Sequence, residues 1–95
     1  MKLVWQPQAL QDLQSVRQYI AADNPAAANR VVTELAALVS KQLLMFPESG
    51  REGRVEGTRE LVVSNSPFII PYRIKSDKIE VLGVHHASRR WPGHF

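Results

Sequence analysis

The side chains of this chain that could take part in chemistry gather in its second half. Two adjacent histidines, His85 and His86, could act as acid or base near neutral pH. Because neighbouring side chains on a regular strand point to opposite faces, we expect that the two do not line one site or bind one metal together if the strand is regular there. We therefore expect no metal site. Basic side chains that could bind an anion lie at Arg59, Arg73, Arg89 and Arg90, and the aromatic ring of Trp91 follows the last of them.

The absence of cysteine narrows the possible chemistry further. The 95 residues contain none, which excludes a disulfide framework, thiolate zinc sites and cysteine nucleophiles. We expect no cofactor. A chain without disulfides fits the reducing cytoplasm, and the short apolar start meets Gln6 and Pro7 before it could become a signal segment or a membrane span. We expect a cytoplasmic protein without a membrane partner.

The net charge of +3 comes entirely from the second half of the chain. Residues 1–48 carry four basic and four acidic side chains, whereas residues 49–95 carry eight basic and five acidic ones, a difference of three. Concentrated positive charge favours encounters with nucleic acid or with an acidic protein. Glutamates interspersed among the arginines weaken the positive surface potential, which disfavours a plain nucleic-acid-binding domain.

Two helices are predicted in the first half, after a short strand at 2–5. Pro7 suits the first turn of a helix that runs to about Ala22, and Asn24 with Pro25 is a cap followed by a first helical residue. The second helix should extend to Phe46. Apolar positions at three- and four-residue steps give each helix one stripe: Leu10, Leu13, Val16 and Ile20, then Ala28, Val31, Val32, Leu35, Leu38, Val39, Leu43 and Phe46.

The second half is predicted to form three antiparallel strands at 58–63, 67–75 and 78–86. These runs are rich in β-branched and aromatic residues, and short polar breaks at 64–66 and 76–77 separate them. Pro71 cannot donate to a ladder, so we expect a bulge there. The fold class is α+β, ordered β-α-α-β-β-β, with a helix hairpin on a small antiparallel sheet and a single domain over 1–95. The buried set should include Leu13, Val16, Ile20, Val32, Leu35, Leu43, Val62, Ile70 and Val81 or Leu82.

Four local motifs within this order resemble the RelE/ParE superfamily of toxins from type II toxin-antitoxin systems. They are the helix break with Asn24-Pro25-Ala26-Ala27, the run from Gly57 to Val63, Pro67-Phe68-Ile69-Ile70 with Tyr72-Arg73, and Val84-His85-His86-Ala87 leading to Arg89-Arg90-Trp91-Pro92. The resemblance covers the length of the chain. The superfamily fold, a helix hairpin laid on an antiparallel sheet, is similar to the one that the periodicity predicts.

The resemblance implies one of two mechanisms. RelE-like toxins are ribosome-dependent endonucleases that cut mRNA, whereas ParE-like toxins bind DNA gyrase. RelE-like members tend to carry an arginine where this chain reads Ser66-Pro67-Phe68-Ile69, so the sequence is more similar to ParE-like members. A nuclease would use His86, Arg59 and Arg89 as its catalytic residues. Whether the chain is an enzyme depends on which mechanism holds.

The resemblance also implies partners. A cognate antitoxin, acidic and partly disordered until bound, would neutralise the toxin, and operator DNA would be contacted only through that antitoxin. For the target, gyrase or alternatively the ribosome with mRNA, we expect a surface of Arg59, Arg73, His86, Arg89, Arg90 and Trp91. The structural alternative is that the arginines pair with Glu56, Glu60 and Glu80 and that Trp91 covers the sheet.

Overall fold

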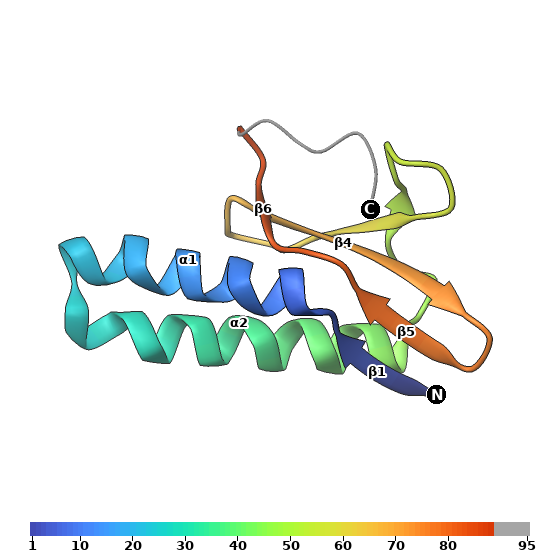
Figure 1. Cartoon of the computed structure of the whole chain (residues 1–95), viewed down its shortest axis with the longest axis horizontal. Helices are drawn as coiled ribbons and strands as arrows, with labels where there is room; N and C mark the ends of the chain where they lie inside the picture. Colours follow the sequence, from blue (N-terminus) through green and yellow to red (C-terminus); the bar gives the residue numbers. More distant parts are fainter. Residues whose placement is uncertain (89–95) are drawn as a thin grey trace.

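The computed structural model describes residues 1–88 as two helices packed on one face of a sheet (Figure 1). The predicted α+β class is confirmed. The elements in chain order are β1 (Lys2–Trp5), α1 (Pro7–Asp23), α2 (Pro25–Met45), β2 (Arg51–Glu52), β3 (Arg59–Val62), β4 (Phe68–Lys75), β5 (Lys78–Val81) and β6 (His85–His86). Within the described residues, no helix has the length and hydropathy needed to cross a bilayer.

The helix hairpin turns at Asn24, as predicted. The Asn24 side chain caps α2 by accepting a hydrogen bond from the Ala27 backbone amide at 3.2 Å. The backbone N–H of Asn24 donates to the Ile20 carbonyl of α1 at 2.7 Å. A single residue therefore ends one helix and begins the next. Pro7 and Pro25 each stand at a helix start, where the missing N–H costs no hydrogen bond.

The sheet has the order β1-β5-β4-β3-β2, with β6 pairing the first residues of β4. Strands β3, β4 and β5 form the predicted antiparallel meander. The first strand instead pairs parallel to β5, with Lys2 opposite Lys78, which makes the sheet mixed. Strand β2 was not predicted, because a two-residue strand leaves no alternating pattern to detect.

The bulge expected at Pro71 is not in β4. That strand keeps a regular register with β3 across Pro71, which faces Glu60. The Pro71 carbonyl points away from β3, toward the end of β5, and accepts from the Leu82 amide at 2.9 Å. The ring nitrogen of Pro71 points to the same side as its carbonyl, because both backbone groups of a residue in an antiparallel strand face the same neighbour. The missing N–H thus falls where the ladder is already interrupted.

The third predicted run, 78–86, is also divided into two strands. Tyr72 pairs with Val81 and Ile69 pairs with His85, so two residues of β4 face three residues of the partner. The extra residue lies in the segment 82–84 between β5 and β6. This break turns the chain toward α1 and places the histidines beside that helix.

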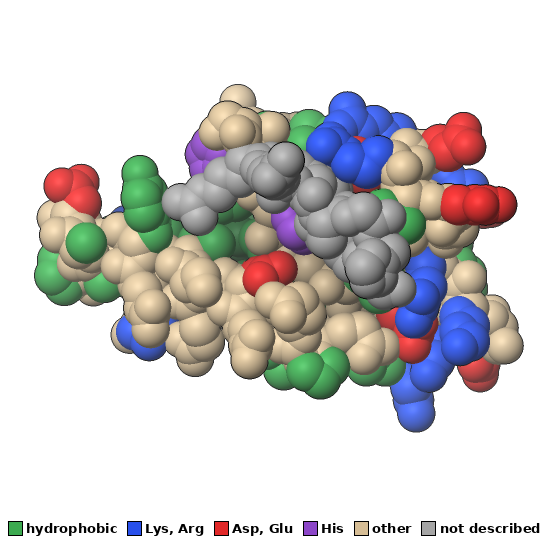
Figure 2. All heavy atoms as spheres, turned by 45° about the horizontal axis from the view of Figure 1, so that its top comes forward, with side chains coloured by type: hydrophobic (Ala, Val, Ile, Leu, Met, Phe, Trp, Pro, Cys, Tyr) green, Lys and Arg blue, Asp and Glu red, His purple; other side chains and the backbone are tan. Residues whose placement is uncertain are grey.

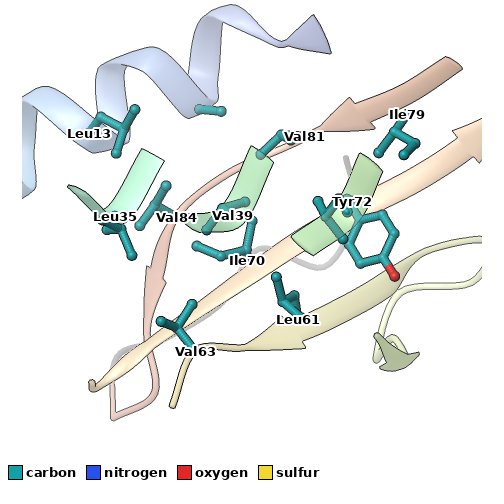
Figure 3. Packing of buried hydrophobic residues seen from close by; sticks show 12 residues of the cluster. Leu13, Leu35, Val39, Leu61, Val63, Ile70, Tyr72, Ile79, Val81 and Val84 are labelled. Carbon is teal, nitrogen blue, oxygen red and sulfur yellow. The ribbon is translucent and has the colours of Figure 1, made fainter. Parts of the chain in front are cut away.

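The core lies between the hairpin and the sheet. Figure 3 shows Leu13, Leu35 and Val39 from the helices pointing toward Ile70 and Val84 of the sheet side. The predicted burial is confirmed for Leu13, Leu35, Leu43, Ile70, Val81 and Leu82, whereas Val16, Ile20 and Val32 are half-buried.

The predicted burial of Val62 is wrong. Val62 is 51% exposed, because Leu61 and Val63 occupy the inward positions of β3 and the residue between them must face the other way.

Candidate functional site: a basic sheet face and a histidine groove

Two buried carboxylates organise the arginines on the sheet face that points away from the hairpin. Glu60 accepts from the Arg51 guanidinium at 3.0 Å and from the amide and Nε of Arg54 at 2.8 and 3.2 Å. Its side chain is only 3% exposed. Burial by itself would raise the pKa of Glu60, but the Arg54 amide and the two guanidinium groups outweigh it and leave the pKa lowered.

Glu80 of β5 has the same role on the other side of β4. Its Oε1 accepts from Arg73 Nε at 2.6 Å. Its Oε2 accepts from the Gln6 side chain at 2.8 Å and lies 3.5 Å from Lys78 Nζ. The hydrogen bond from Arg73 is the main cause that lowers the pKa of Glu80. Arg73, a predicted site residue, is therefore held in place by an ion pair, and its side chain remains 37% exposed.

Arg59 lies on the opposite face of the sheet from Arg73. It is the cross-strand partner of Tyr72, and its guanidinium donates to the carbonyls of Glu48 and Gly50 at 3.3 and 2.9 Å. These bonds hold the segment that follows α2 against β3. The geometry indicates a structural role for Arg59, in addition to any contact with a partner.

A groove of about 590 Å³ runs between α1 and the β4–β6 pair. Its walls combine apolar side chains with a few polar ones, including Asp12, Tyr19, Phe68, His85 and His86. The His86 ring meets the Phe68 ring edge to face with centroids 6.1 Å apart. Together these side chains could receive an apolar or aromatic group that also offers a hydrogen bond.

Both histidines line the groove, so the prediction that they could not share one site is wrong. Their surroundings differ. His86 Nδ1 lies 2.8 Å from the Ser88 hydroxyl and 3.2 Å from the Ser88 amide. Burial lowers the pKa of His85, and the nearby Asp12 carboxylate does not fully offset that effect. The lowered pKa favours the neutral imidazole of His85, which could donate or accept a hydrogen bond without carrying charge.

Asp12 ties α1 to the irregular segment before β6. Its carboxylate accepts from the Val84 amide at 2.9 Å and from the Gln8 side chain at 3.0 Å. A Cβ on Gly83 would lie 2.8 Å from His85 Nε2 and 2.9 Å from Asp12 Oδ2, so a larger residue here would require these two side chains to shift. This contact fixes the position of the histidines relative to the helix.

The predicted site residues do not gather into one cluster. His86 pairs with Phe68 and Arg59 pairs with Tyr72, four residues further along β4, which is roughly 13 Å on a strand. Arg73 lies on the other face from Arg59. Three further candidates fall outside the described residues: Arg89, Arg90 and Trp91.

The basic face also contains residues that were not predicted as site residues. Arg51, Arg54 and Lys78 join Arg73 around the two buried glutamates, and Figure 2 shows Lys and Arg side chains gathered over the sheet end of the molecule. The sequence signal that could have pointed to these residues is the occurrence of a basic and an acidic side chain together in each of β2, β3 and β5. Among the residues that the structure describes, no group of three acidic, histidine or cysteine side chains could hold a metal ion.

Comparisons with known proteins point to one family. Residues 3–91 match the family described as "ParE toxin of type II toxin-antitoxin system, parDE". The chain is 45% identical over 91 residues to "Putative toxin Y4kP" of Sinorhizobium fredii, covering 96% of this chain and 93% of that protein. It is 34% identical over 88 residues to "Toxin RelE2" of Caulobacter vibrioides, covering 93% and 97%.

A solved structure resembles the fold closely. "Chromosomal ParDE TA system from P. aeruginosa" superposes with a TM-score of 0.84 at 28% identity, covering 90% of this chain and 95% of that one. The described helices and strands are thus arranged like those of that solved chain, and the similarity extends over nearly the whole of both chains.

Proposed function

The chain belongs to the ParE toxin family of type II toxin-antitoxin systems, and we propose that it inhibits growth by binding DNA gyrase until a cognate antitoxin neutralises it. One observation carries the choice of a binding mechanism over RNA cleavage. Cleavage needs a base, an acid and a phosphate clamp within reach of one scissile bond. Among the described candidates, His86 pairs with the first residue of β4 and Arg59 pairs with Tyr72, four residues further along, and Arg59 is turned toward the segment after α2.

The charges on the basic face also suit binding better than catalysis. Arg51, Arg54 and Arg73 are held on Glu60 and Glu80, so their positions are fixed before a partner arrives. Pre-positioned arginines lose little conformational entropy on association and often anchor protein interfaces. A gyrase surface with exposed carboxylates would fit them.

Two assays with the purified chain distinguish the mechanisms. We expect the toxin to inhibit DNA supercoiling by gyrase in vitro and to leave transcripts uncut when primer extension maps them in a translating extract. Cleavage products together with unchanged supercoiling would replace this proposal with the RelE-like one, a ribosome-dependent mRNA endonuclease. Inhibition of gyrase without cleavage supports the ParE-like mechanism.

His86→Ala gives a second discrimination. A nuclease that uses His86 as acid or base should lose growth inhibition almost completely, whereas a gyrase inhibitor should lose at most one contact. We expect growth inhibition to weaken less than about tenfold, the equivalent of one modest contact. Ser15→Ala, at another position that lines the groove, is the matched control.

The proposed target surface includes two arginines outside the described range. Arg89→Ala combined with Arg90→Ala should abolish growth inhibition while the far-ultraviolet circular dichroism of the chain stays unchanged. A folded double variant that inhibits growth as strongly as wild type would remove these two arginines from the target surface.

For the antitoxin, the exposed side of the hairpin offers an apolar surface. Large apolar side chains at the end of α2 are about half exposed, namely Leu38, Leu44, Met45 and Phe46. An amphipathic helix of the antitoxin could cover them, while its acidic extended segment lies over the basic sheet face. Co-expression with the product of the adjacent reading frame should restore growth and give a complex that copurifies.

A further inference from the structure

The face of α2 that is turned away from the core combines apolar and charged side chains in one continuous stripe. Figure 1 shows α2 along the side of the molecule away from β4 and β6. The α2 stripe consists of seven exposed residues, namely Arg30, Glu34, Ala37, Leu38, Lys41, Leu44 and Met45. Exposed apolar side chains that lie together on one helix face are typical of an interaction surface.

The two charges in the middle of the stripe lack partners within the described chain. Glu34 and Lys41 are both exposed, and none of the ion pairs among residues 1–88 includes either of them. They are seven residues apart, so on a helix they lie within about 20° of each other around the axis and about 10 Å apart along it. At that separation they do not pair with each other, and each is available to a partner molecule.

We propose that the α2 stripe binds the same stripe of a second copy of this chain, with the two helices antiparallel. A two-fold axis midway between Ala37 and Leu38 brings Glu34 of each copy to the level of Lys41 of the other, because both residues are equally far from that axis. The same axis brings Met45 beside the aliphatic stem of Arg30. The small Ala37 side chain lies near the axis, where the two helices come closest.

The pattern of charges selects a second copy as the occupant. In a membrane surface, Glu34 would lie among the apolar side chains of the stripe without a counter-charge. A nucleic acid would repel Glu34 and would leave Leu38 and Met45 uncovered. Every copy of the chain presents Lys41 where another copy presents Glu34, so one symmetric contact pairs all four charges.

The expected association is weak. The stripe extends over residues 30–45, about 24 Å of helix, and one pair of helices of this length lies near the lower limit of about 1,200 Å² for stable interfaces. We therefore expect a dissociation constant in the micromolar range. The stripe shares Leu38, Leu44 and Met45 with the surface proposed for the antitoxin helix, so the antitoxin would displace the second copy. Only this consequence rests on the proposed neutralisation, because the dimer itself requires neither antitoxin nor gyrase.

Sedimentation equilibrium of the purified full chain tests the dimer. We expect the average mass of wild type to rise from that of a monomer toward twice that value as the concentration increases. Glu34→Lys and Lys41→Glu should each weaken association by at least about tenfold, whereas the two substitutions combined in one chain should restore it, because the ion pairs re-form with reversed polarity. Glu56→Lys, which changes the net charge equally at an exposed position before β3, is the control and should leave association nearly unchanged.

A mixture of the two single variants tests the antiparallel arrangement. Glu34→Lys carries two lysines on its stripe and Lys41→Glu carries two glutamates, so an equal mixture should form mixed dimers although each variant alone stays mostly monomeric. Circular dichroism of each variant shows that it is folded. A wild-type chain that remains a monomer up to about 1 mM, far above the expected dissociation constant, would overturn the proposal. A dimer that is equally stable in wild type and in both single variants would overturn it as well.

Discussion

Tyr72 shows how one side chain can hold the end of a helix and a strand together. Its ring is fully buried in the core, yet its hydroxyl donates to the Pro47 carbonyl at 2.8 Å and accepts from the Gly50 amide at 2.9 Å. A Cβ at position 50 would lie 2.6 Å from the Tyr72 ring, so glycine is needed for this approach. The tyrosine thereby satisfies backbone groups of the segment that leaves α2.

Tyr72→Phe should lower the free energy of unfolding by about 1–3 kcal/mol, because the buried Gly50 amide and the Pro47 carbonyl lose their partner. Urea denaturation followed by circular dichroism measures the change. Thr33→Val, which removes an exposed hydroxyl on α2, is the control and should change stability by less than about 0.5 kcal/mol. Equal effects of the two substitutions would contradict the assigned role of the hydroxyl.

Glu60 should make the stability of the fold sensitive to acid. Its pKa in the folded state is below its ordinary value of 4.5, so the ionised carboxylate stabilises the fold above that pH. The contribution is lost as the pH falls below 4.5 through the folded-state pKa. The free energy of unfolding should therefore decrease as the solution is acidified from pH 4.5 to about pH 3.

Glu60→Gln should be less stable than wild type at pH 7, where Arg51 and Arg54 lose their counter-charge, and should show a shallower loss in acid. Thermal unfolding of both proteins at about pH 7 and about pH 3 checks this. Some of the remaining acid sensitivity belongs to Glu80, whose pKa is lowered by Arg73. Parallel pH profiles of wild type and Glu60→Gln would rule out the assignment.

At the scale of helices and strands, the elements that repeat a pattern were predictable. The helix hairpin, the cap at Asn24 and the meander follow from local periodicity and from short connections, and the structure confirms them. The predicted apolar stripes are only partly right, because Leu10, Leu38 and Phe46 are exposed. The resemblance to the RelE/ParE superfamily, inferred from local motifs, agrees with the family match.

What depends on long-range pairing was not predictable from local pattern. The parallel pairing of β1 with β5 and the division of 78–86 into β5 and β6 are decided by residues far apart in the chain. The pairing of Arg73 with Glu80 was foreseen only as an alternative, and the placement of Arg51 and Arg54 on Glu60 was not foreseen at all. Which strand face a charged residue meets depends on register, which the sequence alone does not specify.

The packing of α2 on the sheet gives an element-scale prediction. Leu35→Ala should cost about 2–5 kcal/mol, because Leu35 is buried within the core and its removal leaves a cavity. Leu38→Ala, three residues along the same helix but 52% exposed, should cost less than about 0.5 kcal/mol. Chemical denaturation of the two variants measures the difference, and similar losses would mean that the assigned inner face of α2 is wrong.

The hydrophobic core of the whole molecule is small, so a bound partner can raise its free energy of unfolding by a large fraction. A ligand that binds only the folded state at about 100 times its Kd adds about 2.7 kcal/mol, which for a domain of this size shifts Tm by roughly 10–20 °C. The complex with the antitoxin should melt higher than the free toxin by this order. Differential scanning calorimetry at several antitoxin concentrations checks the dependence, and a Tm independent of concentration would contradict a tight complex.

The pairing of β1 with β5 also sets the order in which the chain can fold during synthesis. Lys2 meets Lys78, 76 residues later, so the first strand of the protein waits for almost the last one. At about 5–20 residues per second, that wait lasts roughly 4–15 s, during which the helix hairpin can form but the sheet cannot close. A nascent chain therefore lacks its completed sheet until β5 has been synthesised.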